Sequence, residues 1–140
     1  MTSCVFCSII TGNSAAARVL DEPTVLAFLD ASPVFPGHVL IVPRDHHETL
    51  TDLPPQAVND VFLAAQRVAI GVKAAMGADG TWVSMNNTVS QSVAHLHVHV
   101  IPRKRKDGLR GFYWPRQKYA SPDEVATIAA KIAAATPPAS

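Results

Sequence analysis

The stretch HLHVHVIP at residues 95–102 decides the fold of this chain, because three histidines alternate in it with apolar residues. A period of two is typical of a β-strand with one buried face, so the pattern predicts a strand over residues 94–101. With a rise of about 3.3 Å per residue, the first and third histidines would lie roughly 13 Å apart. Leu96, Val98 and Val100 would point into a core, and the three imidazoles would line an open face.

The three histidines of this stretch are His95, His97 and His99. Clustered imidazoles repel one another when protonated and bury little apolar surface, so three on one face indicate a chemical role. Near neutral pH, imidazole can act as a nucleophile, a general acid or a metal ligand. The row by itself leaves two interpretations open, catalysis or convergence of all three histidines on a metal ion.

The composition is that of one globular domain: 140 residues, 48% of them hydrophobic, with a formal net charge of +1. This charge excludes a chain that is basic or acidic throughout. Seven of the 12 Lys and Arg residues nevertheless lie between Arg103 and Lys118, with Asp107 as the one acid there. Such a segment suits an anionic substrate, a nucleic-acid backbone or a solvated loop.

The chain opens without a basic-then-apolar signal peptide, and no apolar run reaches membrane-spanning length, so we expect a cytoplasmic protein. Cysteines stay reduced there, and Cys4 and Cys7 are therefore not expected to form a structural disulfide. Their C-x-x-C spacing is one half of a common zinc site.

Four strands are expected from the apolar runs and their turn residues, at residues 24–29, 38–42, 82–86 and 94–101. Ser-Pro and Pro-Gly pairs lie between the first two strands and predict an antiparallel hairpin. Residues 4–10 are apolar enough for a docked turn or short helix.

A long helix is expected after the second strand, capped by Thr51 or Asp52 and ended by Gly77 and Gly80. Its apolar stripe consists of Val58, Val61, Phe62, Ala65, Val68, Ala69 and Val72.

A second helix is expected from Ser121, which would be its N-cap, with Glu124 closing a capping box. The order strand, strand, helix, strand, strand, helix predicts an α+β fold with a mostly antiparallel sheet. We expect a single domain over residues 1–135 and a disordered tail at 136–140.

Four segments together resemble the histidine triad (HIT) family, in particular its Hint-like branch. They are CVFCSII at 4–10, AFLD at 27–30, PGHVLIVPRDH at 36–46 and QSVAHLHVHVIPR at 91–103. The resemblance implies a HIT-like fold with about five strands, a long central helix and a C-terminal helix, and a homodimer. The aromatic and basic run at 112–116 would cover the active site of the chain or of its partner.

The resemblance also implies a nucleotide hydrolase or transferase. It would act at the α-phosphate of a purine nucleoside phosphoramidate or dinucleoside polyphosphate. His97 would be the nucleophile and form a nucleotidyl-histidine intermediate, while His99 would hold the α-phosphate oxygens. Ser92 would hydrogen-bond the leaving group, and His38 would support the histidines from the adjacent strand.

For the nucleoside, the resemblance implies that Asp30 binds the ribose hydroxyls. An apolar slot for the base would be formed by Val5, Phe6, Ile9, Phe28 and Leu40, some of which would also serve the core. Asn86, rather than Asn87, and Gln91 would contact the nucleotide. The family's glycine-rich loop is replaced here by Asn-Asn-Thr-Val-Ser, so its leaving-group preference does not transfer.

The same resemblance implies a structural zinc ion held by Cys4, Cys7, His46 and His95, with no open coordination position. His47 is the neighbouring competitor for the third position. The alternative is a pair of buried, reduced thiols without a metal.

Two other functions stay open. One is a non-catalytic module that binds zinc and nucleotide. The other is nucleic-acid end processing, as in the aprataxin branch, with the basic residues 103–106. That branch carries an additional nucleic-acid-binding module that is not recognised in this sequence, so we expect neither a nucleic-acid nor a membrane partner.

Overall fold

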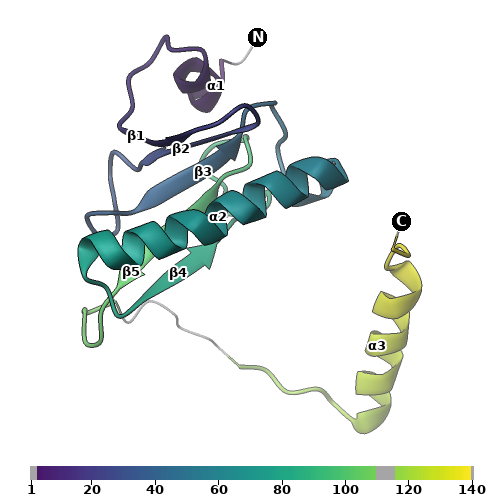
Figure 1. Cartoon of the computed structure of the whole chain (residues 1–140). Helices are drawn as coiled ribbons and strands as arrows, with labels where there is room; N and C mark the ends of the chain where they lie inside the picture. Colours follow the sequence, from purple (N-terminus) through teal and green to yellow (C-terminus); the bar gives the residue numbers. More distant parts are fainter. Residues whose placement is uncertain (1–2, 110–115, 140) are drawn as a thin grey trace. The chain divides into compact units, whose positions relative to one another are not determined.

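The centre of the molecule is a five-stranded sheet in the order β1-β2-β3-β5-β4, and each neighbouring pair runs antiparallel (Figure 1). This computed structural model describes residues 3–109 and 116–139. The strands are β1 Arg18–Asp21, β2 Val25–Leu29, β3 Val39–Pro43, β4 Gly80–Ser84 and β5 Val98–Arg103. The predicted α+β fold and its antiparallel sheet are confirmed.

The helices are α1 Val5–Ile10, the 3₁₀ turn η1 Leu50–Asp52, α2 Pro55–Met76 and α3 Pro122–Ala135. The chain forms two compact units, Met1–Asp107 and Gly108–Ser140. None of the helices in the described residues has the length and apolarity needed to cross a membrane. Most of the aromatic and basic run at 112–116 lies outside the described residues.

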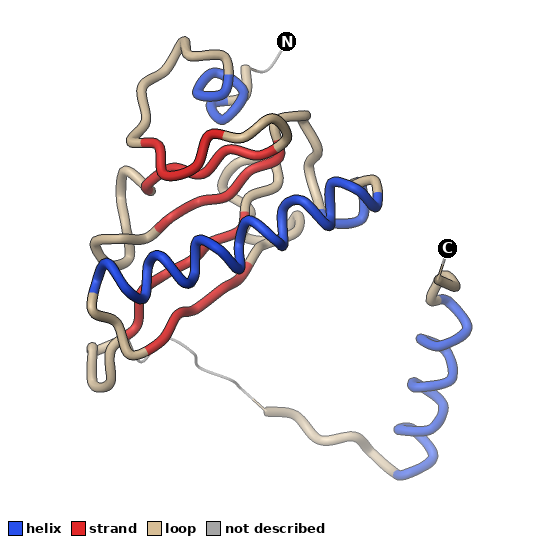
Figure 2. The backbone as a smooth tube through the Cα atoms, in the orientation of Figure 1, coloured by secondary structure: helices blue, strands red, loops and turns tan. Residues whose placement is uncertain are grey.

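The sheet is buried on both faces because alternate residues of its inner strands enter two different clusters. In Figures 1 and 2, α2 lies across one face, where it packs on Val25, Ala27, Val39 and Ile41. The residues between them pack with Phe6 and Ile9 of α1, and they are Leu26, Phe28, Leu40 and Val42. Helix α1 therefore covers the face opposite α2.

The histidine strand differs from its prediction, because β5 begins only at Val98. Before it the chain bends, and the N–H of Leu96 donates to the carbonyl of His47 at 2.7 Å. His95 and His97 are 0% and 3% exposed, so the predicted open face does not exist. The alternation of histidines thus marks a buried bend followed by a strand.

The long helix also differs at its start. Its N-cap is Pro54, whereas Asp52 caps η1 by accepting from the N–H of Thr49. Phe62, expected in the buried stripe, is 41% exposed. Gly77 is the C-cap with φ of 59°, as predicted, but Gly80 is the first residue of β4.

The C-terminal helix begins as predicted, with the Ser121 hydroxyl accepting from the N–H of Glu124 at 3.1 Å. The Glu124 carboxylate does not close the expected capping box, because it accepts from the N–H of Ala120. That N–H lies one residue before the N-cap.

Candidate functional site

A cavity of about 520 Å³ lies between α1, the loop after it and the face of the sheet that α1 covers. Of the residues predicted to act or to bind nucleotide, it is lined by Val5, Phe6, Ile9, Phe28, Asp30, Leu40, Ser92, His97 and His99. The rest of the lining is Ala15, Ala16, Ala17, Leu29, Ala31 and Val93. Three predicted residues, His38, Asn86 and Gln91, are not part of it.

His97 has one ring nitrogen committed to the backbone. Its Nδ1 lies 2.8 Å from the carbonyl oxygen of His95, and a carbonyl can only accept, so Nδ1 carries the proton. In the neutral ring, Nε2 then holds the lone pair. His97 lines the cavity and is 3% exposed. The bend before β5 thus fixes the orientation of the His97 ring and leaves Nε2 free of this hydrogen bond.

His38 and His99 form a relay whose proton positions follow from a backbone amide. The N–H of Val34 donates to Nδ1 of His38 at 3.1 Å, so the proton of the neutral His38 ring is on Nε2. This Nε2–H donates to Nδ1 of His99 at 2.9 Å. In neutral His99 the proton is therefore on Nε2, where it is a hydrogen-bond donor.

The relay is kept neutral by its burial. Desolvation, followed by the charges that His97 and His38 would carry, lowers the pKa of His99 to about 4. Desolvation also lowers the pKa of His38, although the nearby Asp30 carboxylate works in the opposite direction. Both rings are consequently neutral at pH 7, as the hydrogen bonds require.

Asp30 follows directly after β2 and connects the relay to the cavity. Its Oδ2 lies 3.7 Å from Nε2 of His38, and its Oδ1 accepts from the N–H of Ser32 at 2.9 Å. The carboxylate is about one quarter exposed, so Oδ2 stays accessible to hydroxyl groups in the cavity.

Phe6 of α1 stands between two groups of histidines. Its ring makes edge contacts with His97, with centroids 5.0 Å apart, and with His95 at 5.9 Å. It also contacts Phe28 in the cavity wall at 5.5 Å. One side chain thus packs against the predicted nucleophile His97, the predicted metal ligand His95 and the apolar wall.

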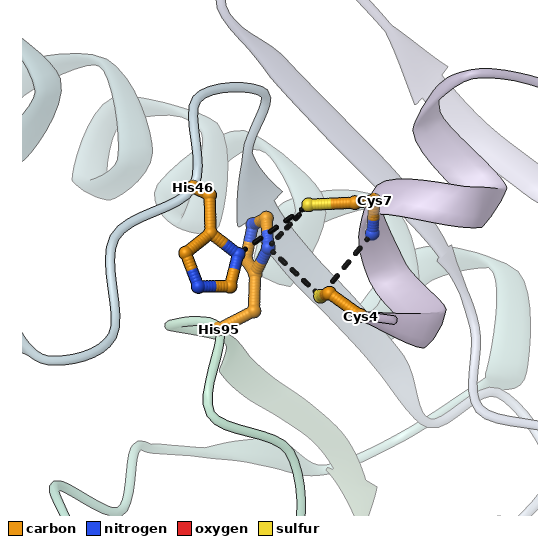
Figure 3. A group of neighbouring side chains, drawn as sticks. All are labelled: Cys4, Cys7, His46 and His95. Carbon is orange, nitrogen blue, oxygen red and sulfur yellow. Dashed lines mark hydrogen bonds between the residues drawn. The ribbon is translucent and has the colours of Figure 1, made fainter. Parts of the chain in front are cut away.

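The predicted metal ligands Cys4, Cys7, His46 and His95 come together from three separate parts of the chain (Figure 3). One ligand atom from each lies within 4.8 Å of all the others. Nδ1 of His95 is 3.4 Å from Sγ of Cys4 and 3.5 Å from Sγ of Cys7. The structure includes His46 in this cluster, with Nδ1 3.4 Å from Sγ of Cys7, rather than the neighbouring His47.

These distances fit a tetrahedral zinc ion. Zinc–sulfur bonds of about 2.3 Å and zinc–nitrogen bonds of about 2.0 Å separate S and N by about 3.5 Å at tetrahedral angles. Nε2 of His95 donates to the carbonyl of Pro43 at 2.9 Å, so its Nδ1 is left bare toward the sulfurs. Two thiolates and two imidazoles form a closed donor set, which favours a structural ion.

The side chain of Gln91 has both polar groups engaged within the protein. Its Oε1 accepts from the N–H of Thr88 at 2.9 Å, and its Nε2 donates to the carbonyl of Glu48 at 2.6 Å. Asn87 is similarly engaged, accepting from the N–H of Leu50 at 2.7 Å. Asn86 is exposed.

Sequence reasoning missed the groups that set the histidine tautomers. They are the amide of Val34 and the carbonyls of Pro43 and His95. All three are backbone groups, so no residue type signals their role. Only the placement of the chain reveals them.

Comparison with known proteins gives several relatives of similar length. An uncharacterized HIT-like protein of Mycobacterium tuberculosis, MT1300, is 40% identical over 108 residues, covering 76% of this chain and 75% of that protein. Adenosine 5′-monophosphoramidase hnt1 of Schizosaccharomyces pombe is 30% identical over 93% of this chain and 96% of its own. Adenylylsulfatase HINT3 of Arabidopsis thaliana is 35% identical over 76% of this chain, which matches 55% of that protein.

Solved structures agree with these matches. A HIT family protein from Bacillus subtilis superimposes with a TM-score of 0.86 at 32% identity, covering 99% of this chain and 100% of that one. A zinc-bound histidine triad family protein from Mycobacterium smegmatis gives a TM-score of 0.74 at 31% identity, covering 96% and 98%. The HIT domain model matches residues 11–106, and the chain therefore belongs to the histidine triad (HIT) family.

Proposed function

We propose that this protein hydrolyses nucleotides at the α-phosphate through a covalent intermediate on His97. The observation that carries the proposal is the tautomer of His97, whose Nδ1–H is bound to the His95 carbonyl at 2.8 Å. This bond leaves Nε2 as the nucleophilic atom of a side chain that lines the cavity. Two relatives support an adenylyl substrate, since their names are adenosine 5′-monophosphoramidase and adenylylsulfatase.

In the first step, Nε2 of His97 attacks the α-phosphorus while the bond to the leaving group breaks. The His95 carbonyl stabilises the positive charge that develops on the imidazole, because it already accepts from Nδ1. Water then attacks the phosphorus, the Nε2–P bond breaks, and a nucleoside monophosphate is released. Ser92, exposed at the mouth of the cavity, would hydrogen-bond the leaving group.

His99 would bind the α-phosphate as a neutral donor. Its Nε2–H is the free end of the relay that starts at the Val34 amide and passes through His38. A donor fixed in this way does not need to reorient when charge grows on the phosphoryl oxygens. The role of His38 is to fix the proton on His99 from outside the cavity.

The remaining lining suits a purine nucleoside. Phe6, Ile9, Phe28 and Leu40 form an apolar surface for the base, and Asp30 can accept from both ribose hydroxyls. A zinc ion held by the Cys/His cluster would crosslink α1, which carries Phe6, to His95, which carries the carbonyl that orients His97. Its chemistry would be structural, because the donor set leaves no open position.

Several expectations belong to the same proposal and stay predictions. They are a homodimer, a cytoplasmic location, a single domain over residues 1–135 and the nucleotide contact of Asn86. A catalytic role is preferred over a purely metal-binding row of histidines, since His97 and His99 have hydrogen bonds of their own outside the Cys/His cluster.

The test is intact mass spectrometry after brief incubation with adenosine 5′-phosphoramidate and, separately, with a diadenosine polyphosphate. We expect an acid-labile adduct with the mass of an adenylyl group in the wild-type protein and none in His97→Ala. His47→Ala is the matched control, because His47 lies outside both the cavity and the Cys/His cluster. Turnover that survives in His97→Ala would refute the mechanism.

A further inference from the structure

The loop at residues 87–92, just before the histidine segment, has two non-glycine residues in the left-handed region. Thr88 has φ of 69° and Ser90 has φ of 61°. The N–H of Val89 donates across Thr88 to the carbonyl of Asn87 at 2.8 Å. A positive φ beneath such a bond is the strained form of the γ-turn, and a β-branched side chain makes it still less favourable. Strain of this kind persists only where neighbouring groups enforce it.

The enforcing group is the carboxamide of Gln91. Its Oε1 receives the N–H of Thr88 at 2.9 Å, which closes the loop on itself. Its Nε2 donates to the carbonyl of Glu48 at 2.6 Å, which attaches the loop to a segment distant in sequence. The two bonds use the oxygen of the amide as an acceptor and its nitrogen as a donor.

Two further bonds join the same pair of segments. The N–H of Leu50 donates to Oδ1 of Asn87 at 2.7 Å, and the N–H of Leu96 donates to the carbonyl of His47 at 2.7 Å. Together with the Gln91 bond, they connect residues 47–50 to both ends of the segment that leads into His97. The segment 87–96 is therefore held at three points, two of which, at Asn87 and Gln91, lie in the loop itself.

The held loop ends at Ser92, which lines the cavity together with His97 and His99. Gln91 itself is half-buried and does not line the cavity. An influence of Gln91 on the reaction would thus have to pass through the position of Ser92 and the chain beyond it.

We propose that Gln91 is a positioning residue that holds the strained loop 87–92 against residues 48–50 and so fixes Ser92 at the leaving-group end of the cavity. This inference rests on the proposed function, because it assigns that end of the cavity to the leaving group. It replaces a direct nucleotide contact of Gln91 with a clamp inside the protein.

The test compares Gln91→Ala with the wild-type protein in steady-state hydrolysis of adenosine 5′-phosphoramidate. A misplaced group near the reacting atoms lowers kcat by about 10- to 100-fold, so we expect a loss of this order. KM should change less than about twofold, because the base and ribose bind among other residues. Hydrogen exchange at the Thr88 amide should accelerate, since its acceptor is removed.

Rescue by glycine separates the clamp from a direct contact. Glycine adopts positive φ without steric cost but does not replace the bond to Glu48, so Thr88→Gly with Ser90→Gly should restore part of the kcat that Gln91→Ala loses. Lys106→Gly is the matched control. Lys106 also has a positive φ, of 61°, but lies after β5, so this change should restore nothing and leave wild-type turnover unaltered.

Three outcomes would overturn the clamp. The first is an unchanged kcat in Gln91→Ala beside a wild-type protein that turns over. The second is a loss of kcat that the two glycines do not restore, which would make Gln91 a substrate contact. The third is unaltered hydrogen exchange at the Thr88 amide in Gln91→Ala. If the wild-type protein shows no His97-dependent turnover, the proposed function fails, and the exchange rate at Thr88 still tests the clamp.

Discussion

Two groups of metal-capable side chains in this protein differ in where their protons lie. Cys4, Cys7, His46 and His95 form one group, and Asp30, His38 and His99 form the other. In each group, the possible ligand atoms lie within 4.8 Å of one another. By distance alone, both could hold an ion.

In each group, one histidine has a ring nitrogen that points away from the group and is hydrogen-bonded to the backbone. This bond determines whether the other ring nitrogen, which faces the group, carries a proton. In the first group, Nε2 of His95 meets the carbonyl of Pro43, so the inner Nδ1 is bare and can bind a metal. In the second, Nδ1 of His38 meets the amide of Val34, so the inner Nε2 carries a proton. One backbone carbonyl and one backbone amide thus distinguish a candidate metal site from a pair of histidines with ordered protons.

Removal of His97, the proposed nucleophile, should have the largest effect and leave the Cys/His cluster intact. We expect His97→Ala to lower kcat by about four orders of magnitude or more, as loss of a covalent nucleophile does in other enzymes. Zinc content measured by atomic emission should stay at one ion per chain, because His97 is not in the cluster. A loss of zinc in this variant would mean that the two groups are not separate.

Disruption of the Cys/His cluster should instead act mainly on the stability of the folded protein. Cys7→Ser removes a sulfur atom that faces both His46 and His95, so we expect zinc to be lost and the free energy of unfolding to fall by several kcal/mol. Urea denaturation with and without a chelator measures this change. His47→Ala, which keeps all four ligands, should match the wild-type protein in both zinc content and midpoint.

The fold was predictable wherever burial follows strand periodicity. Strands β2, β3 and β4 and both long helices were expected within a few residues. Strand β1 was not identified from its own residues, because its burial pattern shows one partly buried side chain among exposed ones. The histidine strand was extended too far, since a bend buried beneath α1 alternates in sequence as a strand does.

The candidate site was predictable in its residue types and not in its hydrogen bonds. Histidines and cysteines could be selected because few other side chains perform their chemistry, whereas Asp30 was selected only through the family resemblance. Sequence alone could not give the tautomers, which depend on the backbone at Val34, Pro43 and His95. Nor could it reveal that Gln91 turns both polar groups to the protein.

The neutral relay makes stability dependent on pH. The folded pKa of His99 is about 4, whereas an unfolded histidine titrates near 6.5. Between these values the unfolded chain binds more protons, so the free energy of unfolding falls as the pH is lowered from about 6.5 to about 4. Denaturation at several pH values should show a shallower decline in His99→Asn. Any release of zinc at low pH would affect the wild-type protein and His99→Asn alike. An identical decline of the free energy of unfolding in the two proteins would therefore argue against a buried neutral relay.

A change at Asp30 should give the smallest effect, because Asp30 is proposed to bind the ribose, away from the reacting phosphorus. Asp30→Asn removes the charge, while the amide oxygen can still accept from the N–H of Ser32 and preserve the turn. Loss of a charged hydrogen bond to ribose costs about tenfold in affinity, so KM for adenosine 5′-phosphoramidate should rise by about that factor. For the 2′-deoxy analogue of this substrate, Asp30→Asn should raise KM by a smaller factor, since one of the two ribose hydroxyls is already absent. If both substrates lose equally and kcat falls instead, the carboxylate acts on His38, 3.7 Å away, rather than on the sugar.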